Sequence, residues 1–305
     1  MIDALLSNRL IFVTGKGGVG KSTACAALGL SLANQGKRVL LIETDTYSAL
    51  AELFGVTLKE SEITRVNDNL SMQNLRSEDA LIHAIRKFLP SERVARTVIQ
   101  NRVARVFFGA APSVNEFSIL NRVYDYLHGD DQHYDHVLVD LPASGHAVTF
   151  LNVPDTLHSM MRGLGRFATL AKTIGEYIRD PDKCAITAVC LPEEMPVNET
   201  IELAQAFEDE LGRGLSATLL NMVHPAPFDE DLRQTFEALD PADAGDASQV
   251  VVANDLALQW YERDAHYTKL LHERMDCPII QLPMLYERTG GDIVRALAAT
   301  LRSDA

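Results

Sequence analysis

The sequence contains few cysteines, and they lie far apart. Only four occur in 305 residues, namely Cys25, Cys184, Cys190 and Cys277, and no two form a Cys-x-x-Cys pair. A small disulfide scaffold would need more cysteines, and a zinc site built from cysteine pairs would need closer spacing. Cys184 and Cys190 could be neighbours in space, but we expect buried structural thiols.

Long apolar runs are also missing. No run approaches the ~18 residues that cross a bilayer, and residues 1–9 lack the extended apolar region of a signal peptide. We therefore expect a cytoplasmic protein without stable membrane insertion. Near the carboxyl end, Ile293, Leu297 and Leu301 form a short stripe that predicts an ordinary final helix rather than a membrane anchor.

Positive charge is scarce. Lys and Arg number 28 against 42 Asp and Glu, which gives a formal net charge of −14. A protein that binds nucleic acid or an anionic membrane through phosphates needs a basic excess. We expect no nucleic-acid partner, although a local basic patch stays possible. Hydrophobic residues make up 47% of the chain, which is ample for a folded core.

Apolar runs alternate with helical patterns along most of the chain. The expected strands are 10–13, 38–42, 70–75, 136–140, 185–191, 217–222 and 278–282. Such alternation predicts an α/β fold, with a doubly wound, mostly parallel sheet of about seven strands and helices on both faces. The length fits one large domain or two, and we expect a single domain over 1–305.

Two mainly helical stretches interrupt this alternation. Residues 77–128 and 154–180 are expected to be insertions that together form a helical subdomain. A helix expected over 157–174 carries Met and Leu residues that could bind an apolar client or could simply pack in the core. Residues 225–247 are expected to form an exposed excursion around one short helix.

A glycine-rich loop follows the first expected strand and precedes a helix expected over 24–33. Its residues are Gly15, Lys16, Gly17, Gly18, Val19, Gly20, Lys21, Ser22 and Thr23. They match G-x-x-x-x-G-K-[ST], in which backbone N–H groups surround the phosphates of a nucleotide. The pattern predicts that Lys21 contacts the β- and γ-phosphates of ATP and that Ser22 offers its hydroxyl to Mg²⁺.

Further polar residues follow other expected strands. Asp140 ends an apolar run, as a Walker B carboxylate does, and is expected to hold Mg²⁺ through water. Gly145 could bring its N–H to the γ-phosphate, and His146 beside it is either a switch residue or a surface histidine. After the second strand, Asp45 could activate the attacking water or could cap the next helix.

Three histidines precede or enter the fourth expected strand. His128, His133 and His136 lie near acidic residues, but their spacing does not match one helix face. We interpret this segment as a solvated acidic loop and not as a metal site.

The second lysine in the loop, Lys16, gives a narrower indication. With a lysine directly after its first glycine, the loop resembles the deviant Walker loop of the arsenite-pump, septum-positioning, plasmid-partition and nitrogenase-iron-protein ATPases. Residues 140–146, with 150–154, resemble switch II of the arsenite-pump (ArsA) and guided-entry branch. Thr44 and Asp45 stand where that branch has its switch I Thr-Asp-Pro.

Roles follow from this resemblance and from matches that span most of the chain. It implies that Lys16 reaches the partner's nucleotide across an ATP-state homodimer and that Asp45 activates water. Asn221 matches the adenine-contacting asparagine of the branch, and Pro283 lies in a late segment resembling its Leu-Pro-Leu-Leu. The implied cofactors are ATP and Mg²⁺.

The sequence also departs from this branch. Residues 46–48 are Thr-Tyr-Ser in place of its Pro-Ala-His/Ser, and the zinc-binding cysteine pair is absent. We therefore expect a dimeric ATP switch that acts on a protein client or a membrane-protein partner. The alternatives are the energy-coupling ATPase of an arsenite-like anion efflux system and a septum- or plasmid-positioning ATPase.

Overall fold

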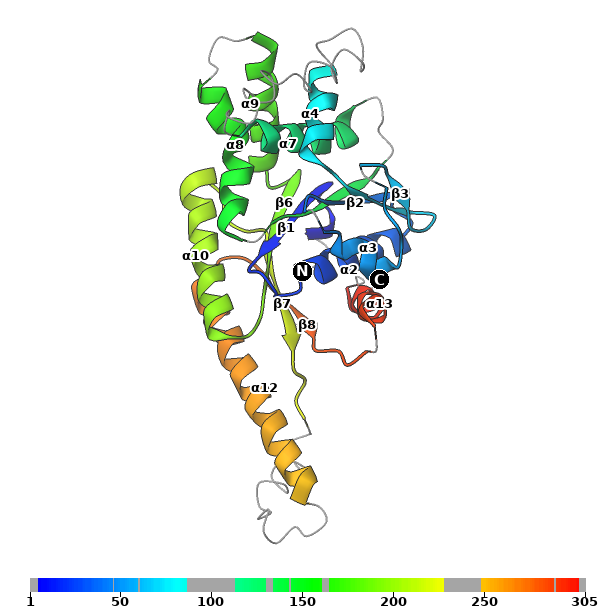
Figure 1. Cartoon of the computed structure of the whole chain (residues 1–305). Helices are drawn as coiled ribbons and strands as arrows, with labels where there is room; N and C mark the ends of the chain where they lie inside the picture. Colours follow the sequence, from blue (N-terminus) through cyan, green and yellow to red (C-terminus); the bar gives the residue numbers. More distant parts are fainter. Residues whose placement is uncertain are drawn as a thin grey trace.

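The computed structural model describes residues 5–45, 47–59, 61–86, 113–129, 134–142, 144–160, 165–227, 248–287 and 289–301. Within these ranges the chain forms one eight-stranded sheet in the order β3-β4-β2-β5-β1-β6-β7-β8 (Figure 1). The strands are β1 (Leu10–Gly15), β2 (Val39–Glu43), β3 (Thr64–Arg65), β4 (Leu70–Asn74), β5 (His136–Asp140), β6 (Cys184–Cys190), β7 (Ala217–Val223) and β8 (Ile279–Pro283).

The expected α/β architecture is confirmed. Every pairing in the sheet is parallel except that of β3 with β4. All seven expected strands are present, and β3 is the additional one. Because β3 has only two residues, its sequence shows no alternation from which it could be predicted.

Helices cover both faces of the sheet (Figure 1). They are α2 (Lys21–Asn34), α3 (Ala49–Phe54), α4 (Ser77–Arg86), α7 (Val114–His128), α8 (Ala147–Met160), α9 (Gly165–Arg179), α10 (Glu194–Leu211), α12 (Ser248–Arg274) and α13 (Gly290–Thr300). Successive side chains of β1 point to opposite faces, so Phe12 packs in one core cluster and Ile11 and Val13 in the other.

Helix α2 lies close against the sheet because its buried face consists mainly of small residues. A Cβ atom at Gly29 would lie 2.5 Å from Leu41 Cδ2, so a larger residue would require the Leu41 side chain or the helix to shift. The helix ends just before Gly36, whose φ of 82° suits glycine after a helix terminus. This packing fixes the first turn of α2, and with it the phosphate loop.

The single helix expected over 157–174 is wrong. The chain forms two helices there, α8 and α9, which pack against each other through an ion pair of Arg179 with Asp155 and a contact of His158 Nδ1 with the Ala168 carbonyl. Gly165 starts α9 with a φ of 60°, a conformation that cannot continue a right-handed helix. Moreover, α8 begins at Ala147, before the expected insertion.

The interpretation of the histidines as part of a solvated loop is also wrong for two of them. His128 belongs to the last turn of α7 and stacks on Tyr124 at 4.2 Å. His136 is buried in β5, where Nδ1 donates to the Asn8 carbonyl at 2.9 Å. His133 lies outside the described residues. No cluster of metal-binding side chains occurs among the residues that the structure describes.

The excursion expected over 225–247 lies mostly outside the described residues. Beyond it stands α12, a helix of 27 residues whose amino-terminal end projects far from the sheet (Figure 1). Throughout the described ranges, no helix combines the length and apolar character needed to cross a membrane.

Candidate nucleotide site

The phosphate loop connects the carboxyl end of β1 to the start of α2. Gly15 has a φ of 140°, and a Cβ atom there would lie 2.3 Å from the Val189 carbonyl oxygen of β6. Gly18 and Gly20 each have a φ of 87°, which L side chains rarely adopt. These glycines allow the backbone to turn tightly beside β6, with the amino terminus of α2 directed at the loop.

Space for a nucleotide lies beside this loop. A cavity of about 790 Å³ is lined by Gly20, Lys21, Ser22 and Thr23 and by residues 289–291 at the start of α13. Its volume fits a small-molecule ligand. Lys21 Nζ donates to the Lys16 carbonyl at 3.1 Å, which keeps the lysine over the loop.

Lys16 contacts α10 of its own chain. Its Nζ atom lies 2.6 Å from Glu199 Oε1 and 2.7 Å from Met195 Sδ. Lys16 and Glu199 are each about one-third exposed. The extended Lys16 side chain that the resemblance implies is therefore replaced here by an ion pair within the chain.

Ser22 and Asp140 come together as expected. The Ser22 hydroxyl donates to Asp140 Oδ2 at 2.5 Å, while Oδ1 is buried without a hydrogen-bond partner in the described part of the chain. An unpartnered carboxylate oxygen beside a serine hydroxyl and a phosphate loop fits Mg²⁺, which prefers oxygen ligands and keeps several waters. The two residues would hold that ion, whose charge would offset that of the phosphates.

Burial dominates the electrostatics of Asp140. The pKa of this carboxyl is raised to about 6, mainly by burial and also by the charge of the nearby Glu43, and the hydrogen bond from Ser22 and the charge of Lys21 oppose this rise. Glu43 and Asp140 are paired residues on neighbouring strands β2 and β5. Two carboxylates at one edge of the sheet make a cation there favourable.

Glu43 is a structural residue that the sequence did not single out. Its carboxylate accepts hydrogen bonds from Ser48 Oγ at 2.5 Å and from the N–H of Ala49 at 2.8 Å, so it holds the amino terminus of α3. Burial raises the pKa of Glu43. The role of Glu43 could have been predicted from its position, since it is an acidic residue at the end of a strand and just before a helix.

The capping role considered for Asp45 is wrong. Ser48 is the N-cap of α3, since its hydroxyl accepts from the Ala51 N–H at 3.1 Å. The side chain of Asp45 is exposed, and its carbonyl accepts from Asn74 Nδ2 at 2.8 Å. Asp45 thus lies in the loop after β2 without a capping function, and water activation stays a prediction.

The segment after β5 forms a short 3-10 turn, Ser144–His146, in which Gly145 and His146 are exposed. His146 and Thr44 line a cavity of about 640 Å³ that also borders the starts of α4 and α7. The loops after β2 and β5 therefore share a cavity with the helical region.

The end of β7 contacts the phosphate loop. Asn221 is buried, and its Nδ2 donates to the Val19 carbonyl at 3.0 Å. Pro283, at the end of β8, is paired with Val223. The structure thus places Asn221 at the loop, with Pro283 on the adjacent strand.

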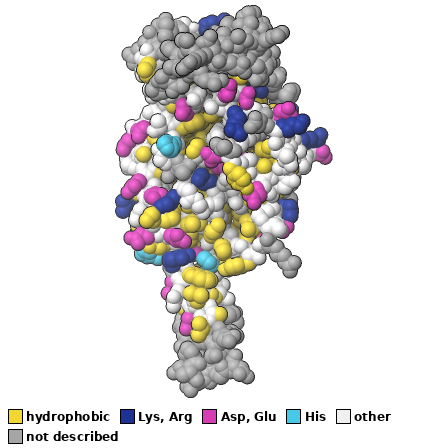
Figure 2. Space-filling model, in the orientation of Figure 1, with side chains coloured by type: hydrophobic (Ala, Val, Ile, Leu, Met, Phe, Trp, Pro, Cys, Tyr) yellow, Lys and Arg dark blue, Asp and Glu magenta, His cyan; other side chains and the backbone are white. Residues whose placement is uncertain are grey.

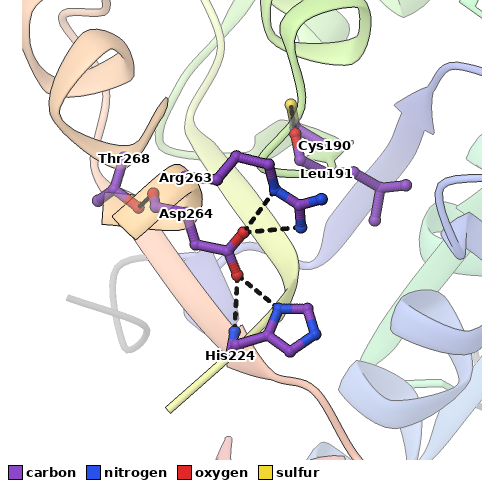
Figure 3. A network of polar contacts seen from close by, with 6 residues as sticks. All are labelled: Cys190, Leu191, His224, Arg263, Asp264 and Thr268. Atoms are coloured by element: carbon purple, nitrogen blue, oxygen red, sulfur yellow. Dashed lines mark hydrogen bonds and ion pairs between the residues drawn. The ribbon is translucent and has the colours of Figure 1, made fainter. Parts of the chain in front are cut away.

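A buried carboxylate ties the same end of β7 to α12 (Figure 3). Asp264 is 1% exposed and accepts from the backbone N–H and Nδ1 of His224, both at 2.8 Å, and from Arg263 at 2.9 Å. The ring of His224 also lies against Trp260, with centroids 5.1 Å apart. These contacts anchor α12 to the sheet.

Charge is mixed on the surface. Figure 2 shows acidic and basic side chains interspersed over the described part of one face. This distribution agrees with the net charge of −14 and does not resemble a phosphate-binding stripe.

Comparisons with known proteins agree with this site. The family model described as "Anion-transporting ATPase" (ArsA_ATPase) matches residues 8–173. The "Putative arsenical pump-driving ATPase 2" of Aquifex aeolicus is 26% identical over 253 residues, which cover 74% of this chain and 84% of that protein. A "Putative arsenical pump-driving ATPase" of Halobacterium salinarum is 26% identical over 302 residues, covering 93% of this chain and 42% of that protein. The "ATPase GET3" of Candida glabrata is 26% identical over 268 residues, covering 74% of this chain and 75% of that protein.

The matched region makes up more than half of the chain and includes the phosphate loop, Asp45 and Asp140. Its fold, an α/β sheet with the loop between β1 and α2, is that of a P-loop nucleotide hydrolase. The chain therefore belongs to the ArsA family of anion-transporting ATPases, and it is a nucleotide-binding ATPase.

Proposed function

We propose that this ATPase uses Mg²⁺-ATP hydrolysis in the cytoplasm to control the binding and release of a protein client or membrane-protein partner. The observation that carries the metal and nucleotide assignment is the contact between Ser22 and Asp140, which leaves Asp140 Oδ1 buried and unpartnered in the described region. Lys21 would stabilise charge on the β- and γ-phosphates, and Asp45 would orient the attacking water.

The cavity shared by Thr44 and His146 supports coupling between nucleotide and client. Its other walls include Ser77 and Glu78 of α4 and Glu116 of α7. Release of the γ-phosphate would move the loops after β2 and β5 and so change the packing of these helices. We infer that residues 1–305 act as one ATPase unit, in which the helical insertions respond to the nucleotide.

The ATP state would be a homodimer joined through the edge that carries the phosphate loop. Lys16 would leave Glu199 and contact the phosphates bound by the partner, where its charge offsets repulsion between two acidic chains. The ion pair between Lys16 and Glu199 of the same chain would then be characteristic of the monomeric state.

An ATPase assay tests the central step. Lys21→Ala should lower Mg²⁺-dependent turnover by ~10²–10³, the effect of losing one strong charge-stabilising donor. Lys172→Ala, an exposed lysine on α9, is the matched control and should hydrolyse ATP at the parent rate. Parent-rate hydrolysis by Lys21→Ala would show that the phosphate site is elsewhere.

Arsenite is not favoured as the transported ligand. Cys25, Cys184 and Cys190 are buried, and burial raises the pKa of each thiol, whereas soft metalloids bind accessible thiolates. Arsenite should therefore leave the ATPase rate unchanged. A several-fold stimulation would support the efflux alternative.

A further inference from the structure

A further cavity lies at the edge of the sheet opposite to the phosphate loop. Its volume is about 670 Å³, and it borders the amino-terminal ends of β6, β7 and β8. Its walls include residues 213–216, which precede β7, and residues 274–277, which precede β8, together with one side of α10. None of the residues that line it belongs to the phosphate loop, so it is separate from the nucleotide site.

Arg213 is a partly buried cation in this cavity, and no acidic side chain of the described residues forms an ion pair with it. Burial lowers the pKa of its guanidinium, and the charges of Cys184 and Asp180 oppose this. However, the pKa of the Cys184 thiol is raised to about 12 by burial, so the thiol is neutral, and Asp180 is ion-paired with Lys183 at 2.5 Å. Because a buried charge is costly unless it is paired, an anion bound beside Arg213 would be favourable.

Hydrogen bonds hold the Arg213 guanidinium in one orientation. Its Nη1 atom donates to the carbonyls of Ile178 and Cys184 at 2.8 and 2.9 Å, and Nη2 donates to Ser216 Oγ at 2.9 Å. A guanidinium has five N–H groups, so one on Nη2 and that of Nε remain. Nε is buried without a hydrogen-bond partner in the described part of the chain. Nε and Nη2 form the edge of the group that can bind both oxygens of a carboxylate.

Ser216 has an unused donor beside this edge. Its hydroxyl oxygen accepts from Arg213 and from the N–H of Ile186, the latter at 3.1 Å. These two bonds occupy both lone pairs, so the hydroxyl hydrogen is left to donate, and no described residue accepts it. The unused polar groups of Arg213 and Ser216 are therefore donors, and an anion that only accepts hydrogen bonds matches them.

The other walls favour a ligand with an apolar part. They include three apolar side chains that are each at most 9% exposed, those of Leu5, Leu215 and Met275. Arg274, in the last turn of α12, adds a second cation. Glu208 and Asp276 also line the cavity, but both are exposed, and neither is ion-paired with an arginine within the described ranges. One anionic group joined to a short apolar chain suits these walls better than inorganic phosphate does.

We propose that this cavity binds a small organic carboxylate. The two carboxylate oxygens accept hydrogen bonds from the Nε–Nη2 edge of Arg213, and the Ser216 hydroxyl donates a third. The aliphatic part of the ligand packs against the apolar walls, where its burial is favourable. The site is independent of the proposed binding of ATP, since the two cavities share no lining residue.

Two probes of equal chain length separate the anionic group from the apolar part. In isothermal calorimetry at neutral pH, hexanoate should bind ~10–100-fold more tightly than 1-hexanol, as expected for hydrogen bonds to a charged group. Equal affinities would show a merely apolar cavity and would overturn the proposal. Failure of hexanoate to bind would overturn it as well.

Variants at the two arginines locate the carboxylate. Arg213→Lys keeps the charge but loses the bidentate edge, so hexanoate should bind ~3–10-fold more weakly while hexanol is unaffected. Arg274→Gln removes an exposed charge and should weaken hexanoate binding ~2–5-fold. Arg166→Gln, at an exposed arginine of α9, is the matched control and should bind both probes like the parent.

Thermal unfolding accompanies these measurements, because Arg213 also holds the carbonyls of Ile178 and Cys184. If Arg213→Lys were unfolded, the comparison of Arg274→Gln with Arg166→Gln would decide alone. Hexanoate binding at the parent affinity in the folded variants of Arg213 and Arg274 would place the carboxylate elsewhere and refute the proposal.

Discussion

Lys16 Nζ lies 2.6 Å from Glu199 Oε1, although the two residues are 183 positions apart in the chain. Glu199 belongs to α10, which follows β6, the neighbour of the loop-bearing strand β1. Both side chains are about one-third exposed, so the pair contributes only ~0–1 kcal/mol. A contact this weak can be exchanged for one with a more highly charged phosphate group.

The first prediction concerns this exchange. Glu199→Gln removes the competing carboxylate, so a slowly hydrolysed ATP analogue should drive dimerisation at ~2–5-fold lower concentration, measured by analytical ultracentrifugation. Glu202→Gln, an exposed residue on the same helix, should behave like the parent. Lys16→Ala should lose the difference between analogue and ADP. Equal dimerisation of Lys16→Ala and the parent would remove Lys16 from the interface.

The second prediction concerns Asp45. Asp45→Asn keeps the size of the side chain but loses its basicity, so ATP should bind normally while turnover falls by ~10²–10⁴. Nucleotide binding by calorimetry and single-turnover hydrolysis would measure the two effects separately. If ATP binding were lost with turnover, Asp45 would be needed for the loop structure and not for the chemistry.

The third prediction is a trade-off between stability and function at Asp140. Burial raises the pKa of this carboxyl to about 6, so its ionised form destabilises the protein without Mg²⁺ at neutral pH. Asp140→Asn removes that charge and should raise the free energy of unfolding by ~1–3 kcal/mol, since one pKa unit corresponds to ~1.4 kcal/mol. ATP hydrolysis should be lost. Urea unfolding would refute this prediction if the variant were less stable than the parent.

The fourth prediction is a pH dependence from His136. Burial lowers its pKa from the ordinary value of 6.5, the hydrogen bond to Asn8 and the charge of Asp135 oppose this, and Lys37 and Arg9 add to it. The unfolded chain therefore takes up a proton at higher pH than the folded protein does. The contribution of His136 to the free energy of unfolding should be complete above pH ~6.5 and should fall as the pH drops towards the lower pKa of the folded state.

The substitution His136→Gln isolates the contribution of His136 to the pH dependence of stability. Glutamine can still donate to the Asn8 carbonyl but does not titrate, so its stability should depend less on pH between ~6.5 and 5 than that of the parent. Urea unfolding of both proteins at several pH values gives the comparison. Identical pH profiles would show that the pKa of His136 is the same in the folded and unfolded states.

Much of the fold and the phosphate site follows from local pattern and parallel topology. Because the carboxyl ends of parallel strands meet at one edge, Ser22 and Asp140 could be expected to approach each other. The break between α8 and α9 was also visible, since Gly163 and Gly165 interrupt the helical pattern. However, apolar residues at helical spacing on both sides of these glycines predicted one continuous helix.

Other features depend on long-range packing and could not be predicted. The contact between Lys16 and Glu199 joins distant segments, and no local pattern encodes it. The positive φ of Met222 arises from a register shift between β7 and β8, while its sequence neighbours resemble an ordinary strand. Glu43 was overlooked as the residue that holds α3, because Asp45 stands closer to the usual capping position.

The anchoring of α12 by Asp264 has a mechanical consequence. The sixteen residues of α12 that precede Asp264, from Ser248 to Arg263, span ~24 Å at ~1.5 Å per residue, and this arm points away from the sheet (Figure 1). Asp264, at the base of this arm, is hydrogen-bonded to His224, which lies three residues after Asn221, the asparagine that contacts the phosphate loop. A tilt of roughly 10° about that point would displace the tip of the helix by ~4 Å, because the helix is long relative to its attachment.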